Sequence, residues 1–478
     1  MIDFNNTYVN LPEIFYAEAQ AANASAPELI AFNEELARDL ELKLDQACDE
    51  KLAALFTGQE LTQSSRPISV AYAGHQFGHF VPQLGDGRAM LLGEVLTSNK
   101  QRFDIQLKGS GPTRYSRNGD GKSSLGPVIR EYIMSEAMHS LGVSTTRALA
   151  ACLTGEPVYR QEVLPGGILT RVAASHIRVG TFEFFAGAGD LEHLKVLADY
   201  AIDRHYPHIK NDKNIYLSFI KEVTYAQAKL IASWLSFGFI HGVMNTDNTS
   251  IAGETIDYGP CAFMDNFSHD RSFSSIDRNK RYAYNNQIEI GKWNLTRLAS
   301  CLIPLVDNDD ATSIKMIEES IKSYSFIYEQ EWRNKMRKKL GLFDEHPGDA
   351  KLINLWLNYL QQQDLDFTLS FRALSEIQHN FTKTELFNEF NSLWSTRLDE
   401  QSQSIESARE LMNSVNPIFI ARNHQVERAI QAGLKNDFSV LKEMVELFKN
   451  PYLDQKKYEK YKQAPIAEER IQATFCGT

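Results

Sequence analysis

The segment HGVMNTDNTSIAGETIDYGP, residues 241–260, has the most informative spacing of polar side chains in the chain. It follows an apolar run, residues 230–240, which we expect to form a buried helix. Within the segment, Asp247, Asn248 and Asp257 supply two carboxylates and an amide oxygen. Mg²⁺ and Mn²⁺ prefer such oxygen ligands when they are bound to the phosphates of a nucleotide. The segment therefore indicates a site for a metal and a nucleotide.

The spacing of these residues resembles that of protein kinases, which carry H-x-D-x-x-x-x-N followed shortly by D-x-G. His241 and Asn248 occupy the matching positions, and D-Y-G follows at 257–259. Val243 stands where a kinase has its catalytic aspartate, whereas Asp247 lies directly beside the asparagine. The metal-binding residues are thus kept and the usual base is absent. This indicates a nucleotide site adapted to something other than ordinary phosphorylation, with an acidic loop after a core helix as the alternative.

The composition is that of an ordinary globular protein, with 478 residues, 43% of them hydrophobic and 23% charged. A net charge of −11 argues against a nucleic-acid-binding surface. No arginine precedes Arg38, and no apolar run reaches the length of a membrane span, so we expect no signal peptide, transit peptide or membrane helix. The cysteines are scattered and form no C-x-x-C pair, which predicts a reducing compartment, by default the cytoplasm, and no structural zinc.

A glycine-rich turn, Gly85-Asp86-Gly87-Arg88, leads into an apolar strand at residues 89–95. Glycines let backbone N–H groups approach phosphates closely, and Arg88 would add a charge-assisted contact. A plain β-turn is the alternative.

Residues 103–108 alternate with period two, which predicts a strand with its apolar side chains on one face and Lys108 on the other. Lys108 is either a solvated strand end or the lysine of a kinase-like small lobe, which neutralises phosphate oxygens. The second role requires a glutamate on a helix to hold the lysine. A helix predicted at 128–141 offers Glu131 and Glu136, and we prefer Glu131.

Between this strand and helix lies a basic, glycine-rich segment, residues 108–127. It is not a Walker motif, because Ser116 replaces the first glycine, and Arg114 breaks the pattern G-x-G-x-x-G. The segment is either a disordered loop or a flap in which Asp120 and Gly121 touch the nucleotide.

Residues 145–172 are typical of strands, and they end in a pair of arginines, Arg171 and Arg178. Seven residues apart, these arginines share a face only in a helix; otherwise a bend must bring both inward. Beside a nucleotide they would balance the charge of a triphosphate.

Five long motifs together resemble the selenoprotein O family of pseudokinases. They are QLGDGR (83–88), QLKGSGPTRYSRNGDGKSSLGPVIRE (106–131), TRVAASHIRVGTFE (170–183), the segment 241–260 and SVNPIFIARNHQVERAI (414–430). The resemblance covers nearly the whole chain. It implies a kinase-like fold that binds ATP turned around, so that the α-phosphate faces the acceptor. The implied reaction transfers AMP to Ser, Thr or Tyr hydroxyls of proteins and releases pyrophosphate.

The resemblance also implies a role for each site residue. Asp247 would be the general base, Asn248 and Asp257 would hold Mg²⁺ or Mn²⁺, and Glu131 would hold Lys108. The implied nucleotide-binding residues are Gly85, Gly87, Arg88, Lys108, Asp120, Gly121, Glu131, Arg171, Arg178 and Asp257. Cys476 stands where some relatives carry selenocysteine, so a redox role would depend on a weaker nucleophile.

These motifs predict an α+β, protein-kinase-like two-lobed fold with helical extensions at both ends. We expect an N-terminal helical extension over 1–65, based on helical spacing at 28–56, a small lobe over 66–175, a large lobe with the metal site over 176–300, and a helical region over 301–478. Amphipathic helices are predicted near 313–340, 351–362, 383–395, 402–413, 424–433 and 437–448.

The expected partners are a nucleotide triphosphate and protein substrates, with no nucleic acid and no membrane. Three alternatives to AMP transfer stay open at this point. They are uridylyl transfer from UTP at the same site, an atypical kinase that transfers the γ-phosphate with Asp247 as its base, and a non-catalytic nucleotide-binding redox adaptor.

Overall fold

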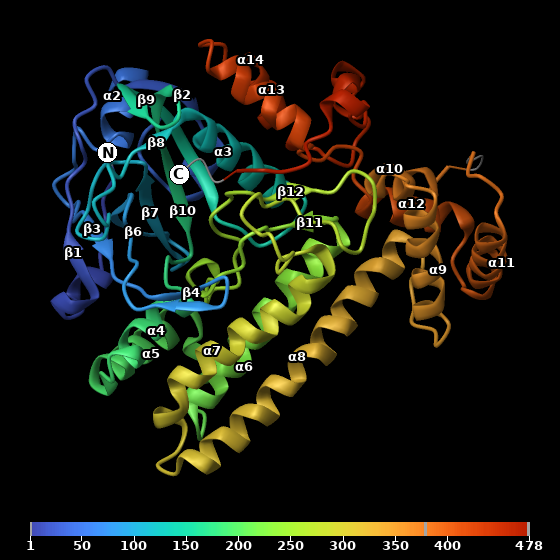
Figure 1. Cartoon of the computed structure of the whole chain (residues 1–478), viewed down its shortest axis with the longest axis horizontal. Helices are drawn as coiled ribbons and strands as arrows, with labels where there is room; N and C mark the ends of the chain where they lie inside the picture. The colour runs from blue at the N-terminus through green and yellow to red at the C-terminus, as the bar shows by residue number, and fades with distance from the viewer. Residues whose placement is uncertain (1, 377–379, 476–478) are drawn as a thin grey trace.

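The computed structural model describes residues 2–376 and 380–475, and its N-terminal half is built on an antiparallel sheet of eight strands (Figure 1). The strand order is β1-β3-β6-β7-β10-β9-β2, and β8 pairs with β10. The strands are β1 (Tyr16–Glu18), β2 (Glu28–Phe32), β3 (Ile68–Val70), β6 (Ala89–Leu96), β7 (Arg102–Lys108), β8 (Ser123–Ser124), β9 (Arg147–Tyr159) and β10 (Val163–Ala173).

The two faces of the sheet are covered by different helices. On one face, Ile105 and Leu107 of β7 pack in a cluster with residues of α1 (Glu34–Asp39) and α2 (Asp49–Phe56). On the other face, α3 (Leu125–Ser140) packs against β9 and β10. The period-two pattern of β7 is therefore confirmed, and it places Lys108 at the strand end on the side of α3.

The helical prediction for residues 28–56 is wrong at its start. Residues 28–32 form β2, which pairs with the outer edge of β9, and helix is confined to α1 and α2. The free backbone N–H and C=O groups of an edge strand favour another strand there, whatever the spacing of apolar residues. The N-terminal region thus supplies β1 and β2, the two edge strands of the sheet, and is more than a helical extension.

The apolar run 230–240 is also divided differently from the prediction. The long helix α6 (Ile215–Ser236) ends before Gly238, which has a left-handed φ of 69°. The last residues form the strand β11 (Phe239–Ile240), paired with β12 (Ala262–Phe263). A buried helix and a buried strand that follow one another produce one apolar run in the sequence, so only Gly238 indicates the boundary between them.

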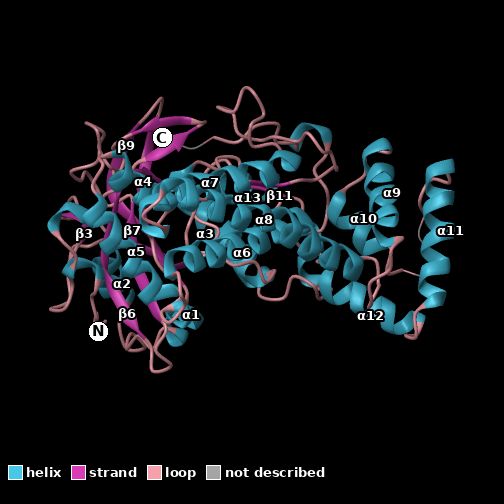
Figure 2. Cartoon of the chain, turned by 90° about the horizontal axis from the view of Figure 1, so that it is seen from below, coloured by secondary structure: helices cyan, strands magenta, loops and turns pink. Residues whose placement is uncertain are grey.

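The rest of the chain is mainly helical. Helices α6, α7 and α8 lie side by side next to the sheet, α9 to α12 extend away from it, and α13 and α14 return to pack on α3 (Figures 1 and 2). The remaining helices are α4 (Val179–Gly187), α5 (Leu191–His205), α7 (Gln287–Val306), α8 (Asp310–Lys339), α9 (Asp349–Gln362), α10 (Phe367–Ala373), α11 (Glu385–Glu400), α12 (Ile405–Val415), α13 (Asn423–Gly433) and α14 (Ser439–Phe448).

The helices predicted beyond residue 301 are confirmed as α8, α9, α11, α12, α13 and α14. In the part of the chain that the structure describes, none of the helices combines the length and apolar character needed to cross a bilayer. The tail residue Cys476 lies outside the described residues.

Candidate functional site

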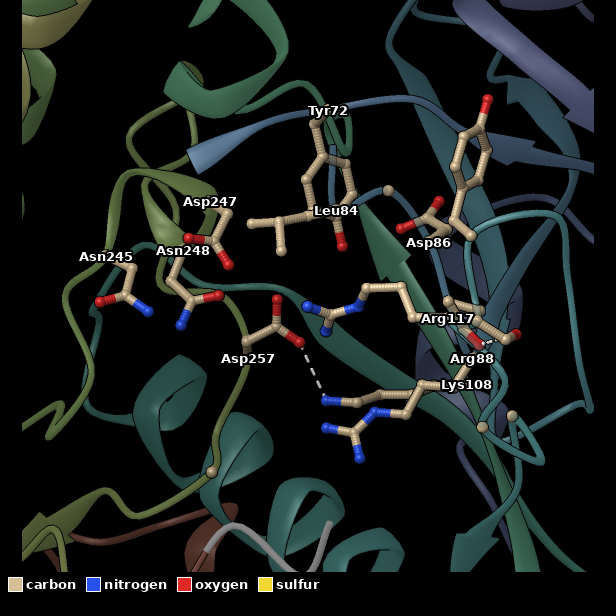
Figure 3. Close-up of a pocket in the computed structure, with 18 of the residues that line it drawn as sticks. Tyr72, Leu84, Asp86, Arg88, Lys108, Arg117, Asn245, Asp247, Asn248 and Asp257 are labelled. Atoms are coloured by element: carbon tan, nitrogen blue, oxygen red, sulfur yellow. Dashed lines mark hydrogen bonds and ion pairs between the residues drawn. The ribbon is translucent and has the colours of Figure 1, made fainter. Parts of the chain in front are cut away.

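A cavity of about 680 Å³ lies between the sheet and the segment 241–260 (Figure 3). In the close-up, Asn245, Asp247, Asn248 and Asp257 line one side, and the cationic side chains face them. Of the twelve residues to which the resemblance assigns a role in nucleotide binding, metal binding or catalysis, eleven line the cavity. These are Gly85, Gly87, Arg88, Lys108, Asp120, Gly121, Arg171, Arg178, Asp247, Asn248 and Asp257.

Asp257 lies at the centre of a cluster of cations. Its Oδ1 accepts hydrogen bonds from Lys108 Nζ at 2.9 Å and Arg171 Nη2 at 2.7 Å, and its Oδ2 accepts one from Arg178 Nη1 at 2.7 Å. Burial alone would raise the pKa of Asp257, but the three positive charges outweigh burial and hold that pKa well below its ordinary value. The backbone of Asp257 has a positive φ of 61°, a conformation that aspartate adopts more readily than most residues other than glycine.

Glu131 is not a lining residue; it lies behind the cavity and holds two of these cations. Its Oε2 accepts from Lys108 Nζ at 2.6 Å, and its Oε1 accepts from Arg171 Nε at 2.9 Å. Glu136, the other candidate on α3, instead accepts from Arg147 Nε at 2.9 Å. The lysine–glutamate pair expected from the sequence is therefore present, and it involves Glu131.

Arg171 and Arg178 converge through a bend and not through a shared helix face. Arg171 is on β10, which ends at Ala173, and Arg178 precedes the first residue of α4. The Arg178 guanidinium stacks on the Tyr72 ring, 4.7 Å from its centroid, and lies 3.9 Å from a buried carboxylate oxygen of Asp86. The cluster thus presents fixed positive charge to the cavity, as a phosphate site requires.

Asp247 combines burial with an incomplete set of hydrogen bonds. It lies in a 3₁₀ turn, Thr246–Asn248, and is only 8% exposed. Its Oδ1 has no hydrogen-bond partner among the described residues, and its Oδ2 accepts one long bond of 3.4 Å from Gln76 Nε2. Burial raises the pKa of Asp247 to about 6. With this pKa, the carboxylate is ionised at neutral pH and is a stronger base than an ordinary aspartate, so it is suited to accept a proton.

A hairpin of two short strands, β4 (Gly74–Gln76) and β5 (His79–Val81), seats the turn that carries Asp247. The backbone N–H of His75 donates to Thr246 Oγ1 at 2.6 Å, and that of Phe77 donates to Asn245 Oδ1 at 2.9 Å. Sequence reasoning missed Gln76 and Asn245. The only local signal for the hairpin was Gly78, which with Phe77 forms the two-residue turn at positive φ, and Asn245 had no signal of this kind.

Asn248 and Asp257 suit a divalent ion that is carried by a nucleotide. Asn248 Nδ2 donates to the Val243 carbonyl at 3.0 Å, which orients the amide. The described residues contain no cluster of three or more His, Cys, Asp or Glu side chains that would hold a metal unaided. One carboxylate and one amide oxygen fit Mg²⁺ or Mn²⁺, because such ions take their other ligands from phosphates and water.

The flap lines the cavity, and the Asp120 carboxylate is paired there with another lining residue, Arg160. The carboxylate accepts two hydrogen bonds from the Arg160 guanidinium, at 2.7 and 3.0 Å. Gly121 has φ of 62°, and a Cβ there would lie 2.1 Å from the Gly111 carbonyl oxygen, so only glycine fits. At Gly121, contact with a ligand would therefore come from the backbone.

A cation cluster opposite a buried, basic carboxylate defines a nucleotide-dependent transferase. The family model described as "Protein adenylyltransferase SelO" matches residues 1–449, and the chain belongs to that family. The prediction that this chain is an enzyme that transfers AMP to proteins is therefore confirmed at the level of the family.

Several curated relatives, each called "Protein nucleotidyltransferase YdiU", match almost end to end. The relative from Rhizobium rhizogenes is 50% identical over 100% of this chain and 97% of its own length. The relative from Rhizobium meliloti is 49% identical over 99% of both chains. The relative from Bacillus cereus is 49% identical over 100% of this chain and 98% of its own.

Proposed function

We propose that this enzyme binds ATP with the α-phosphate directed toward Asp247 and transfers AMP to a Ser, Thr or Tyr hydroxyl of a protein. The observation that carries this proposal is the position of the carboxylates. Val243 lines the cavity where a kinase would have its base, while the buried, basic Asp247 lies four residues further on. If the nucleotide is reversed, the acceptor hydroxyl must lie at a different place from the acceptor in a kinase. The base must then also lie at a different place, and Asp247 meets this requirement.

The proposed reaction uses the two sides of the cavity differently. Asp247 takes the proton from the acceptor hydroxyl, whose oxygen attacks the α-phosphorus and displaces pyrophosphate. Lys108, Arg171 and Arg178 stabilise the charge that develops on the leaving pyrophosphate. Mg²⁺ or Mn²⁺, held by Asn248 and Asp257, would neutralise phosphate charge when bound.

We also propose that the fold is kinase-like and two-lobed, divided as expected near residues 175 and 300. The Lys108–Glu131 pair supports this assignment, because kinases join the same strand and helix in this way. A cytoplasmic location is supported by Cys48, Cys152 and Cys301, whose thiols are not joined in disulfides.

ATP labelled at either the α- or the γ-phosphate tests the proposed reaction. We expect a protein acceptor to retain only the α-label. Retention of only the γ-label would make the protein a kinase, and retention of neither, with nucleotide still bound, would make it an adaptor. α-labelled UTP, used in parallel, tests uridylyl transfer.

A further inference from the structure

A second hollow, of about 550 Å³, adjoins the nucleotide cavity, because Phe77 and Ile276 line both. We call it the side groove and define it by the lining residues used below, Phe77, Ile276, Asp277, Arg278, Arg281 and Glu289. The two hollows meet at Phe77, which lies in the turn of the hairpin.

The side groove opens on the Asp247 side of the nucleotide cavity. Its hairpin wall and its far wall meet at Asn245, whose Oδ1 accepts bonds from the Phe77 N–H at 2.9 Å and from the Tyr282 hydroxyl at 2.6 Å. The neighbouring Gln76 reaches the Asp247 carboxylate. An acceptor hydroxyl placed at Asp247 would therefore have its flanking residues in this groove.

Arg281 is held in the groove without a carboxylate partner. Its guanidinium carbon lies 4.8 Å from the centroid of the Trp293 ring and 5.8 Å from that of Tyr282. Its Nε is buried without a hydrogen-bond partner, and no ion pair of Arg281 occurs within residues 2–376 and 380–475. Two aromatic rings and a hydrogen bond to the Tyr282 side chain thus fix an arginine that has no carboxylate partner, and its Nε and planar guanidinium suit a carboxylate ligand.

The side groove contains two acidic residues, Asp277 and Glu289, and neither forms an ion pair with Arg281 in the described residues. Asp277 is buried, and its carboxylate accepts the backbone N–H groups of Arg281 and Tyr282, both at 2.8 Å. Glu289, in the first turn of α7, is exposed to solvent. Arg278 is exposed on the same rim, so the two arginines and the two carboxylates of the groove balance in formal charge. What the groove offers an acidic ligand is therefore the guanidinium of Arg281 itself, which forms no ion pair in the described residues.

An apolar contact lies at the junction of the two hollows. Ile276 is 56% exposed although it lines both, and the ring of Phe77 packs against Tyr282 at 5.2 Å between centroids. Covering an exposed isoleucine at the mouth of a cavity with an apolar group of a ligand removes apolar surface from water, which favours binding.

We propose that the side groove binds the polypeptide segment next to the acceptor hydroxyl, and that it selects a segment with an acidic side chain, which pairs with Arg281, beside an apolar one, which packs on Ile276. This inference rests on the proposed transfer of AMP to proteins. It adds the recognition that such a transfer needs in order to choose its targets.

Synthetic peptides test this recognition on the full-length enzyme with ATP labelled at the α-phosphate. Each peptide has one central Ser, Thr or Tyr and an apolar neighbour, and the set differs only in whether Glu, Gln or Lys flanks the acceptor. We expect kcat/KM to be roughly 5- to 10-fold higher with Glu than with Gln. Arg281→Gln should remove this ratio, Arg281→Glu should reverse it in favour of Lys, and Arg281→Lys should keep part of it, all with KM for ATP unchanged.

Arg38→Gln is the matched control, because Arg38 is an exposed arginine on α1, outside both hollows. Equal labelling of the Glu and Gln peptides would overturn the inference. The inference would also be overturned if the enzyme itself, or proteins of a mixed extract, carried the label while none of the peptides did. No α-label on any acceptor would instead overturn the proposed function.

Discussion

Arg178 Nη1 donates a hydrogen bond of 2.6 Å to the backbone carbonyl oxygen of Asp247. The same guanidinium group bonds Asp257 at 2.7 Å and so belongs to the cation cluster. The guanidinium group of Arg178, which we propose binds phosphates, therefore also fixes the turn that carries the proposed base. We expect ordering of the cluster by nucleotide to order Asp247 as well.

Replacing Asp257 by alanine should abolish transfer, because it removes a proposed metal ligand. It should also leave the charges of Lys108, Arg171 and Arg178 without their shared carboxylate. Nucleotide binding in the presence of EDTA, measured by calorimetry, should therefore be kept or strengthened, since phosphates can take the place of the carboxylate. Full transfer activity in the variant would show that the metal assignment is wrong.

Replacing Asp247 by asparagine should lower the rate of transfer by about 10²- to 10⁴-fold if Asp247 is the base. In the unchanged enzyme, the rate should rise with pH as Asp247 ionises, near its pKa of about 6, and then level off. Initial rates between pH 5 and 8 check both statements. A near-normal rate in the variant would mean that the acceptor needs no base here.

The same substitution should make the folded protein more stable at neutral pH. The pKa of Asp247 is raised from 3.8 to about 6 on folding, mainly by burial, so the folded state binds its proton more tightly than the unfolded state. Stability is therefore lost as pH rises from about 4 to 6. The asparagine variant would escape that loss, and we expect a gain of about 1–3 kcal/mol in the free energy of unfolding at pH 7.5. Urea denaturation should show this gain disappearing below about pH 4.

Glu131→Gln should weaken both stability and catalysis, because Glu131 is 3% exposed and holds Lys108 and Arg171. Breaking a buried pair of this kind costs about 3–5 kcal/mol. Burial opposes ionisation of Glu131, but the charges of Arg171 and Lys108 outweigh it and lower its pKa below 4.5. Its contribution is therefore complete above pH 4.5 and is lost as pH falls through the lowered value.

Glu136→Gln is the control for this prediction, because Glu136 lies on the same helix and holds Arg147 instead. It should lower the melting temperature without changing KM for ATP, whereas Glu131→Gln should change both. Equal kinetic effects of the two variants would place Glu131 outside the nucleotide site.

The part of the site that sequence could predict is the part fixed by local spacing. Lys108 ends a strand with a clear period, and Glu131 lies in the second turn of the next helix, so both could be assigned without coordinates. Gln76 and Asn245 could not be. Gln76 meets Asp247 across 171 residues of sequence, and nothing in a single chain's pattern records a contact of that kind.

The elements of the fold that sequence could predict are likewise those set by local spacing. The amphipathic helices beyond residue 301 have polar and apolar faces that set their limits, and they were found within a few residues. The strand β2 was missed because its structure depends on the open edge of β9 and not on its own residues. Asp120 shows the same limit at a side chain, since its orientation depends on Arg160, which is 40 residues distant.

The last prediction concerns Gly74, on the hairpin strand next to Asp247. A Cβ at Gly74 would lie 2.6 Å from Asp247 Oδ1 and 2.9 Å from its Cβ, too close for either to stay in place. The backbone of Gly74 is not left-handed, so alanine would leave the strand intact and displace the carboxylate. Because a displacement of about 1 Å can cost 10²-fold in rate, we expect Gly74→Ala to lower kcat by about 10- to 100-fold with KM for ATP nearly unchanged.

Gly348→Ala is the matched control for this substitution, because its new Cβ would meet only the His346 side chain, far along the sequence from the cavity residues. It should leave both kinetic constants unchanged. A normal kcat in Gly74→Ala would mean that the position of Asp247 does not limit the reaction. A raised KM for ATP with normal kcat would mean that the hairpin serves the nucleotide and not the acceptor. Only a loss confined to kcat agrees with a base on the acceptor side, because in the described residues no hydrogen bond or ion pair joins Lys108, Arg171 or Arg178, the proposed phosphate ligands, to this strand.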